Sequence, residues 1–289
     1  MSNHNRFATM LQNAVQEGRA VAAFNVYNLE SATAAVQAAQ RTGAPVILAL
    51  GERYFANVRP VVMRAMVDAL VPADMRERVA LHLDHAAAKE SCMEAIEAGF
   101  DSVMIDGSHL PFAQNAQVTK EVVEAAHARG VGVEAELGGL AAGDSSHEFS
   151  TGTQVLTDPE QAALFVAETN VDALAVSVGT VHGLYRGEPH VDLPRLQEIH
   201  QRIAQPLVLH GGSGTPAPLL REAVARGVAK VNVNTEVALA AVQRIAGLVV
   251  DKPRIHFAEL GLASVEAMTA VMEDYILRFD SKRPLPLSR

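Results

Sequence analysis

The chain has 289 residues and a formal net charge of −9 at pH 7, with 49% hydrophobic and 20% charged residues. These values are typical of a soluble globular protein with a large core, and the negative charge without a basic run argues against nucleic acid as a partner. Cys92 is the only cysteine, which excludes a disulfide framework or a cysteine-rich zinc site.

The N-terminal segment, residues 1–20, contains no apolar core of the kind found in signal peptides and is typical of an amphipathic helix. No later apolar stretch reaches the length needed to span a membrane. Together with the single cysteine, these features predict a cytoplasmic protein that works without a membrane partner.

Short apolar runs recur along the chain, and helical patterns alternate with them. The runs are unbroken and rich in Val, Ile, Leu and Ala, as expected of strands that are buried on both faces. We expect strands at residues 20–27, 45–50, 78–85, 102–108, 132–138, 173–180, 206–212 and 230–236. We expect helices between them at 88–98, 112–129, 159–169, 192–204 and 217–226.

This alternation of strands and helices predicts an α/β fold, a single (β/α)₈ TIM barrel, which typically needs roughly 250 residues. The alternative is an open, doubly wound sheet, but such sheets usually carry a glycine-rich first turn. The segment after the first strand here is "NLESATAA" (28–35), without glycine. No linker is evident, so we expect residues 1–289 to form one domain with an extra C-terminal helix at 262–279.

Three histidines stand at the C-terminal ends of three different strands, where TIM barrels place their chemistry. They are His85, His182 and His210. Three imidazoles on one rim match a catalytic zinc site with its fourth position open. Alternatively, each histidine only caps its strand, although the small-residue turns around all three would let a ligand approach the backbone. His82 lies inside a strand and is expected to be a hydrogen-bonded core histidine. Other polar residues at strand ends are Asn25, Asp106, Ser108, Glu136, Asn234 and Thr235.

Two turns predict a site for a phosphate group. Phosphate sites in barrels often follow strands seven and eight, where this chain has "GGSG" (211–214) and "NVNTE" (232–236). Gly211, Gly212 and Ser213 can offer backbone N–H groups, and the second turn leads into a helix N-terminus, which favours anions.

None of the five lysines ends a predicted strand, so a Schiff-base enzyme is not expected. What remains is a Lewis-acid metal, a neighbouring carboxylate and a phosphate site. This combination suits a reaction that passes through an enolate and in which a carboxylate moves a proton.

Six ordered motifs between about residues 7 and 250 resemble the class II, zinc-dependent ketose-bisphosphate aldolase family, the fructose- and tagatose-bisphosphate group. The motifs are "HLDH", "MIDGSHLPFAQN", "VEAELGGL", "GTVHGLYRGEP", "LVLHGGSG" and "KVNVNTE". The resemblance implies a lyase of carbohydrate metabolism that reversibly cleaves a ketose 1-phosphate or ketose 1,6-bisphosphate to dihydroxyacetone phosphate and an aldehyde. It also implies a homo-oligomer, a homodimer or homotetramer.

The resemblance also implies roles for individual residues. His85, His182 and His210 would bind Zn²⁺, and Asp84 would exchange a proton with the C4 hydroxyl. Asp106 and Glu136 would form an alternate metal position, and a monovalent cation, Na⁺ or K⁺, would lie near the phosphate. The expected substrate-binding residues are Asn25, Gly183, Gly211, Gly212, Ser213, Asn232, Val233, Asn234 and Thr235.

The C-terminal region departs from the family pattern. The segment "DKPRIHF" (251–257) keeps Arg254 in an altered context. An ungapped alignment on "RFDS" (278–281) places Glu273 where the family has an arginine for the distal phosphate, and a shift of one turn would bring Arg278 there instead. A glutamate at that place would repel a second phosphate, so we expect a ketose 1-phosphate to be used at least as well as a bisphosphate.

The loop at 138–152 has glycines and small polar residues that would let it fold over the site. We expect Asp144 or Glu148 in this loop to act as the second base.

Two other functions are compatible with a barrel. A metal-dependent TIM-barrel hydrolase usually needs a paired His-x-His on strand one, whereas that strand ends "FNVYN" (24–28). A non-catalytic sugar-phosphate-binding barrel would have lost rim residues that are all present here.

Overall fold

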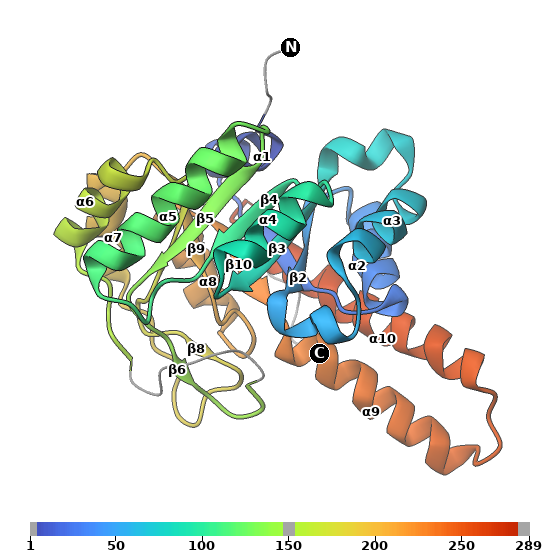
Figure 1. Ribbon diagram of the computed structural model, residues 1–289. Coiled ribbons are helices and arrows are strands. Elements are labelled where there is room, and N and C mark those ends of the chain that lie inside the picture. The colour runs from blue at the N-terminus through green and yellow to red at the C-terminus, as the bar shows by residue number, and fades with distance from the viewer. Residues whose placement is uncertain (1–4, 147–153, 283–289) are drawn as a thin grey trace.

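The computed structural model describes residues 5–146 and 154–282. Its centre is a closed barrel of parallel strands in the order β1-β10-β9-β7-β5-β4-β3-β2 (Figure 1). The strands are β1 (Val21–Asn25), β2 (Val46–Gly51), β3 (Val79–Ala86), β4 (Ser102–Ile105), β5 (Gly132–Leu137), β7 (Ala173–Val176), β9 (Leu207–Leu209) and β10 (Val228–Val233). The predicted TIM barrel is therefore confirmed.

Several strands end earlier than predicted. The segments after β4, β7 and β9 leave the barrel wall as turns, and these turns carry glycines and polar residues of the rim. A second, two-stranded sheet, β6 (Ala141–Ala142) with β8 (Val181–His182), was not predicted and lies outside the barrel. Strands of two residues give too little periodicity to be recognised in a sequence.

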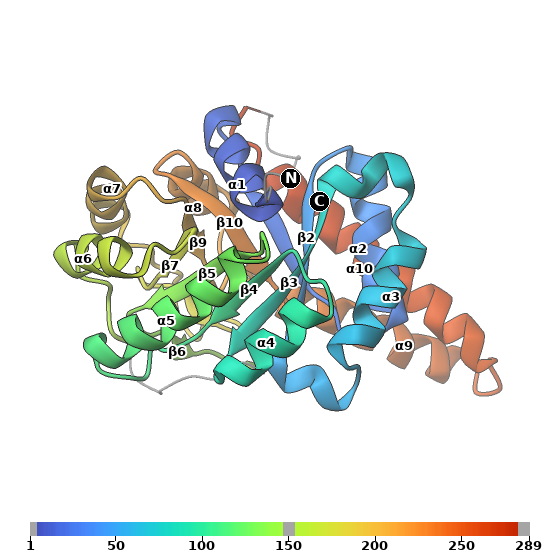
Figure 2. The same ribbon diagram turned by 45° about the horizontal axis from the view of Figure 1, so that its top comes forward.

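The helices surround the barrel, as Figures 1 and 2 show. They are α1 (Arg6–Glu17), α2 (Leu29–Thr42), α3 (Pro60–Leu70), α4 (Lys89–Glu97), α5 (Phe112–His127), α6 (Pro159–Thr169), α7 (Leu193–Arg202), α8 (Ala217–Val224), α9 (Thr235–Asp251) and α10 (Phe257–Arg278), with 3₁₀ turns η1 (Glu52–Ala56) and η2 (Ala73–Arg78). None of the helices in the described ranges combines the length and apolarity that a bilayer-spanning segment requires.

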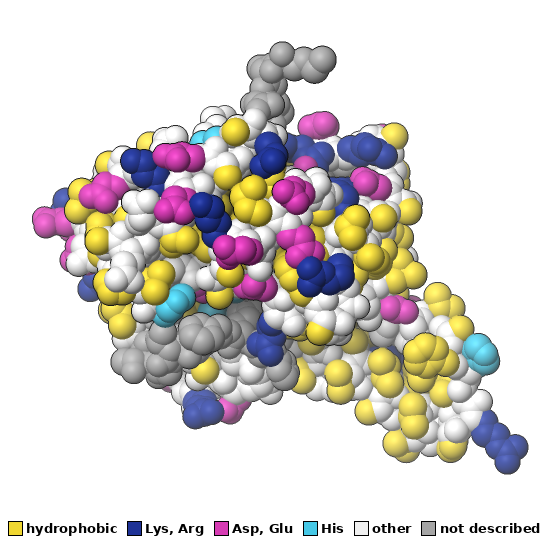
Figure 3. All heavy atoms as spheres, viewed as in Figure 1, with side chains coloured by type: hydrophobic (Ala, Val, Ile, Leu, Met, Phe, Trp, Pro, Cys, Tyr) yellow, Lys and Arg dark blue, Asp and Glu magenta, His cyan; other side chains and the backbone are white. Residues whose placement is uncertain are grey.

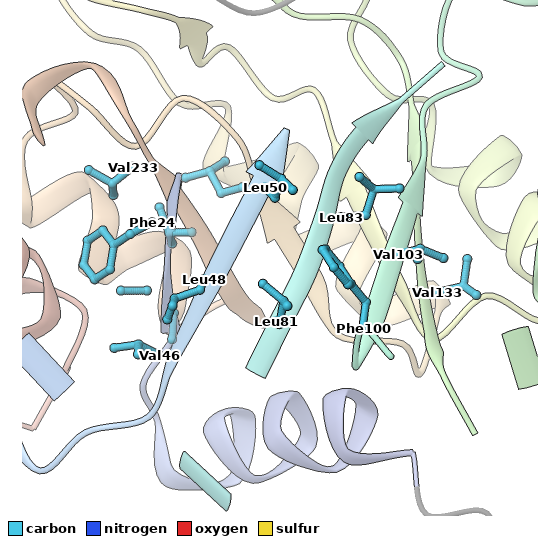
Figure 4. Close-up of a cluster of buried hydrophobic side chains, with 14 of the residues drawn as sticks. Phe24, Val46, Leu48, Leu50, Leu81, Leu83, Phe100, Val103, Val133 and Val233 are labelled. Carbon is cyan, nitrogen blue, oxygen red and sulfur yellow. The ribbon is translucent and has the colours of Figure 1, made fainter. Parts of the chain in front are cut away.

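Alternation of side chains along each strand separates two environments. In β3, Leu81 and Leu83 are fully buried in the core between strands and outer helices (Figure 4). Because successive strand residues point to opposite faces, His82 and Asp84 face the interior of the barrel. The same strand therefore contributes to both the apolar core and the site.

Helix α1 closes the N-terminal end of the barrel. Its Phe7 and Leu11 are fully buried and join a second apolar cluster with interior residues such as Ala23 and Ala80. Phe7 stacks on the His82 ring, with the ring centroids 5.5 Å apart. Small residues inside the barrel leave room for these side chains, which fill its N-terminal half. The polar groups lie at the C-terminal ends of the strands.

The last two helices form an arm. In Figures 1 and 2, α9 leaves the C-terminal end of β10 and projects from the barrel, and α10 returns beside it. The C-terminal half of α10 packs on the barrel, where Met272 and Tyr275 are buried. The predicted helix at 262–279 is confirmed and begins earlier, at Phe257.

Candidate active site

Asp84 and His85 occupy an irregularity of β3. The register with β4 shifts between Leu83 and Ala86, and His85 has a φ of +47°, in the left-handed region. A non-glycine residue in this region costs free energy that the surrounding structure must offset. Bulges of this kind redirect side chains at the ends of strands, and here the irregularity turns the His85 ring toward the centre of the rim.

The three predicted histidines come together. Nε2 of His85 lies 2.7 Å from Nδ1 of His210, and the His182 ring centroid lies 5.1 Å from that of His85 and 6.0 Å from that of His210. One ring nitrogen from each residue lies within 4.8 Å of the others. Three imidazoles from β3, β8 and the end of β9 therefore converge on a single point.

In two of these rings, the nitrogen that points away from the other histidines forms a hydrogen bond with a carboxylate. Nδ1 of His85 lies 2.9 Å from Oδ2 of Asp106, and Nε2 of His210 lies 2.9 Å from Oε1 of Glu134. This pairing fixes the ring orientation of histidines that bind metals and raises their basicity. It leaves Nε2 of His85 and Nδ1 of His210, the two nitrogens that face each other, to bind a cation. The donor set fits a divalent metal that accepts imidazole nitrogen.

A second group of metal-binding type shares His85. His85, Asp106 and Glu136 also present ligand atoms within 4.8 Å of one another. Glu136 is buried, and its burial together with the nearby Asp106 raises the pKa of its carboxyl well above the usual range. Its Oε2 has no hydrogen-bond partner within the described ranges. These residues are thus close enough to share a cation, and the alternate metal position at Asp106 and Glu136 stays a prediction.

The electrostatic surroundings of His85 favour positive charge. Burial lowers the pKa of its imidazole, but Asp84 and Asp106 raise it by more, so the pKa lies well above its ordinary value. The groups that stabilise a charged imidazole here would equally stabilise a bound cation.

Asp84 is buried and held from two sides. Its Oδ2 accepts a hydrogen bond of 2.9 Å from Nδ2 of Asn25 on β1, and its Oδ1 accepts one of 3.0 Å from Nδ2 of Asn232 on β10. Burial raises the pKa of its carboxyl, but the positive charges of His85 and Lys230 outweigh that effect and hold the pKa well below the usual range. Asp84 is therefore a fixed carboxylate beside the three histidines.

Beneath the histidines lies a buried ionic cluster that was not predicted. Nζ of Lys230 lies 2.8 Å from Oε2 of Glu134, and Nε2 of His82 lies 3.7 Å from the same oxygen. Burial raises the pKa of Glu134, but Lys230 and His210 lower it by more, to about 2. His82 bonds Oγ of Ser102 through Nδ1 at 2.8 Å, which confirms it as a hydrogen-bonded core histidine.

The residues predicted to bind phosphate lie on neighbouring strand ends. β9 and β10 are paired, so the turn 211–214 lies beside 232–235. The second turn leads into a helix N-terminus as predicted, since α9 begins at Thr235. One detail differs from the prediction. The N–H of Gly212 donates to the Asn232 carbonyl oxygen at 2.9 Å, so this group is engaged within the barrel wall.

Close packing of backbone explains two glycines of the rim. Gly183 has a φ of +97°, and a Cβ atom there would lie 2.5 Å from the Asp144 carbonyl oxygen. Gly211 has a φ of +74°, and a Cβ atom there would collide with the Val181 carbonyl oxygen. These glycines let the β6–β8 loops pack onto the rim, which places His182 beside the other two histidines.

Glu273 does not lie beside the histidines of its own chain. Nη1 of Arg41, at the C-terminal end of α2, lies 3.1 Å from Oε1 of Glu273, so this glutamate lies toward the N-terminal end of the barrel, away from the histidines. Arg278 pairs with Asp274 on its own helix at 2.5 Å. Within one chain Glu273 is thus no neighbour of the histidines, and the expected use of a ketose 1-phosphate at least as well as a bisphosphate stays a prediction.

Asp144 and Glu148 are the two acids of the loop predicted to fold over the site. Asp144 is exposed, and its Oδ1 lies 2.7 Å from Nε of Arg186. Glu148 lies outside the described residues. Which of the two is the second base stays a prediction.

A cavity of about 280 Å³ opens beside Asp84 and His85. Its other lining residues are Asn25, Gly51, Glu52, Arg53 and Tyr54. The residues from η1 were not predicted, because they follow a strand without any motif that singles them out.

Comparison with known proteins gives consistent results. A family model described as "Fructose-bisphosphate aldolase class-II" matches residues 5–283. The chain is 42% identical over 248 residues to the "Probable fructose-bisphosphate aldolase" of Bacillus subtilis, covering 84% of this chain and 86% of that protein. It is 42% identical over 240 residues to the fructose-bisphosphate aldolase of Staphylococcus aureus, covering 82% of each. The crystal structure of the YdjI aldolase from Escherichia coli K12 superposes with a TM-score of 0.82 at 30% identity, covering 95% of this chain and 97% of that one.

Proposed function

Since the chain belongs to the class II fructose-bisphosphate aldolase family, we propose that it holds Zn²⁺ between His85, His182 and His210 and uses Asp84 to move a proton of its substrate. The activity is that of a carbon–carbon lyase, the reversible cleavage of a ketose bisphosphate to dihydroxyacetone phosphate and an aldehyde. Membership of this family sets aside the hydrolase and the non-catalytic barrel. The observation that carries the site assignment is the convergence of three imidazoles, two of them fixed by Asp106 and Glu134.

Asp84 performs the proton transfer. Cleavage removes the proton of the C4 hydroxyl as the C3–C4 bond breaks, and the Asp84 carboxylate accepts that proton while C4 becomes the aldehyde carbon. The electron pair of the broken bond stays with the three-carbon half, which then needs a proton at C3, and Asp144 or Glu148 is the predicted donor. When bound, the metal supplies Lewis-acid polarisation of the substrate carbonyl.

The substrate-binding assignment rests on buried polar atoms. Oδ1 of Asn25 and Oδ1 of Asn232 are buried and have no hydrogen-bond partner in the part of the chain that the structure describes. Leaving such atoms unpaired costs about 1–3 kcal/mol each, so substrate hydroxyls are suitable partners. The phosphate of the dihydroxyacetone half would lie at Gly183, at Gly211 to Ser213 and at Val233 to Thr235, with Na⁺ or K⁺ beside it.

We also propose that the protein is a homo-oligomer, a homodimer or homotetramer. The arm formed by α9 and α10 exposes apolar side chains, which gather along it in Figure 3. Val250 is 78% exposed, Phe257 84% and Leu262 74%. Apolar surface of this kind on a projecting element suits contact with a second copy of the chain.

Metal removal tests the proposed function. Chelation should abolish release of dihydroxyacetone phosphate from fructose 1,6-bisphosphate, and added zinc or cobalt should restore it. In His210→Ala, metal content measured by plasma mass spectrometry should fall with activity, because one of three ligands is lost. His190→Ala is the matched control, since His190 is exposed on a loop. Full activity in a metal-free His210→Ala protein would contradict the assignment.

A further inference from the structure

The wall of the cavity beside Asp84 carries an arginine that the site assignment above does not use. The cavity of about 280 Å³ is formed at the ends of β1, β2 and β3, by Asn25, by residues 51–54 and by Asp84 and His85. Arg53 also borders a neighbouring cavity of about 320 Å³ together with Asn234 and Thr235. It therefore stands where the two hollows of the C-terminal face meet.

No carboxylate among the described residues neutralises the charge of Arg53. Within residues 5–146 and 154–282, no carboxylate forms an ion pair with its guanidinium, which lies over the Tyr54 ring at 5.6 Å from the centroid. The neighbouring Glu52 is engaged elsewhere, because its carboxylate accepts hydrogen bonds from the Ala87 N–H and the Ser91 hydroxyl. A cavity wall in a chain of net charge −9 thus presents an available positive charge.

The position of this cavity relates it to one half of the substrate. If the proposed function is correct, the dihydroxyacetone phosphate half lies at the ends of β9 and β10, and Asp84 receives the C4 hydroxyl proton. Asn232 on β10 bonds one oxygen of Asp84, and Asn25 on β1 bonds the other. The carbons beyond C4 then extend past Asp84 toward β2, where the cavity opens and Arg53 stands.

We propose that Arg53 determines specificity by binding an anionic group, a phosphate or a carboxylate, at the far end of the aldehyde half of the substrate. The guanidinium presents several N–H donors in a plane that matches the oxygens of either anion. The cation–π contact with Tyr54 orients it without consuming its charge. This inference rests on the proposed function and deepens it by naming the residue that recognises the far end of the aldehyde.

The test is condensation of dihydroxyacetone phosphate with three aldehydes. We would use glyceraldehyde 3-phosphate, succinic semialdehyde and glyceraldehyde, which carry a phosphate, a carboxylate and no charge. Arg53→Ala should lower kcat/KM for at least one anionic aldehyde about tenfold, mainly through KM, because a charge-assisted hydrogen bond is lost. Glyceraldehyde should change less than twofold. Arg53→Lys should recover part of the loss, since it keeps the charge.

Arg59→Ala is the matched control, because Arg59 follows the same 3₁₀ turn but pairs with Glu94 outside the cavity. The aldehyde with the larger loss identifies the anion as phosphate or carboxylate. An equal loss for all three aldehydes would overturn the proposal, since Arg53 would then serve the shared phosphate, and so would unchanged kinetics. Absence of condensation by the wild-type protein with every aldehyde would instead overturn the proposed function, and this assignment with it.

Discussion

A single buried carboxylate shows how this site is held. Asp84 is 1% exposed, and a charged group in such a place is costly unless hydrogen bonds and opposite charge offset the loss of water. Asn25 and Asn232 supply the hydrogen bonds, and His85 and Lys230 supply the charge. Asp84 is therefore kept ionised and in one position, as its proposed role of proton acceptor requires.

The role of Asp84 can be separated from that of the metal. In Asp84→Ala we expect cleavage of fructose 1,6-bisphosphate to fall roughly 10²- to 10⁴-fold, the usual contribution of a placed carboxylate, while bound zinc and the affinity for dihydroxyacetone phosphate stay unchanged. Calorimetric titration and metal analysis would measure the two retained properties. Asp74→Ala, an exposed carboxylate on η2, is the control. Activity within a few fold of wild type would mean that another group is the acid.

Site residues can be predicted from the sequence where the end of a predicted strand already places them at the rim of the barrel. His85, His182 and His210 could be predicted because each ends a strand at the rim. Glu134 and Lys230 could not, since both lie inside strands and a partner across the barrel is invisible in one sequence. Strand alternation places their side chains on the same face as Glu136 and Asn232, two residues along each strand, but it does not reveal that the two pair with each other. Arg53 could not be singled out in the sequence, because only the fold brings it to the cavity beside Asp84.

The elements of the fold follow from hydrophobic pattern, and their ends follow from local chemistry. All eight barrel strands were predictable, because unbroken apolar runs mark strands covered on both faces. The helix predicted at 159–169 is α6, and the side chain of its N-cap residue, Asp158, accepts hydrogen bonds from two N–H groups of the first turn. The β6–β8 pair and the start of α10 were not predictable, since two-residue strands and exposed helix ends lack a periodic signal.

One contact between elements makes stability depend on pH. Nε2 of His127, at the C-terminal end of α5, lies 2.8 Å from Oδ2 of Asp172, which precedes β7. The hydrogen bond to Asp172 raises the pKa of His127 despite its partial burial. Because the folded pKa lies above the unfolded value, the stabilisation is full below about pH 6.5 and is lost as pH rises through the folded pKa.

We therefore expect His127→Gln to lower the free energy of unfolding by about 1 kcal/mol more at pH 6 than at pH 9. Urea denaturation at the two pH values measures this difference. The same substitution in an Asp172→Asn background is the control, because the ion pair is already absent there. A difference that persists in that background, or one that is larger at pH 9, would show that the pair is not the cause.

At the scale of the whole molecule, the barrel and the arm divide the work. The barrel strands bury their apolar residues and carry polar groups at one end, whereas the arm of α9 and α10 leaves large apolar side chains in solvent (Figure 3). Covering these helices would be favourable, because burial of each large apolar side chain contributes about 1.5–3 kcal/mol of stabilisation. The proposed assembly of copies through the arm would account for its composition.

The last prediction tests that assembly. In an interface related by twofold symmetry each substitution acts twice, so Val250→Asp or Phe257→Asp should raise the dissociation constant at least about 100-fold. Sedimentation velocity over a range of concentrations measures the shift toward monomer. Val61→Asp is the matched control, because Val61 is 65% exposed but lies on α3, outside the arm. A wild-type protein that is monomeric at every concentration, or arm variants that assemble as the wild type does, would contradict an interface on α9 and α10.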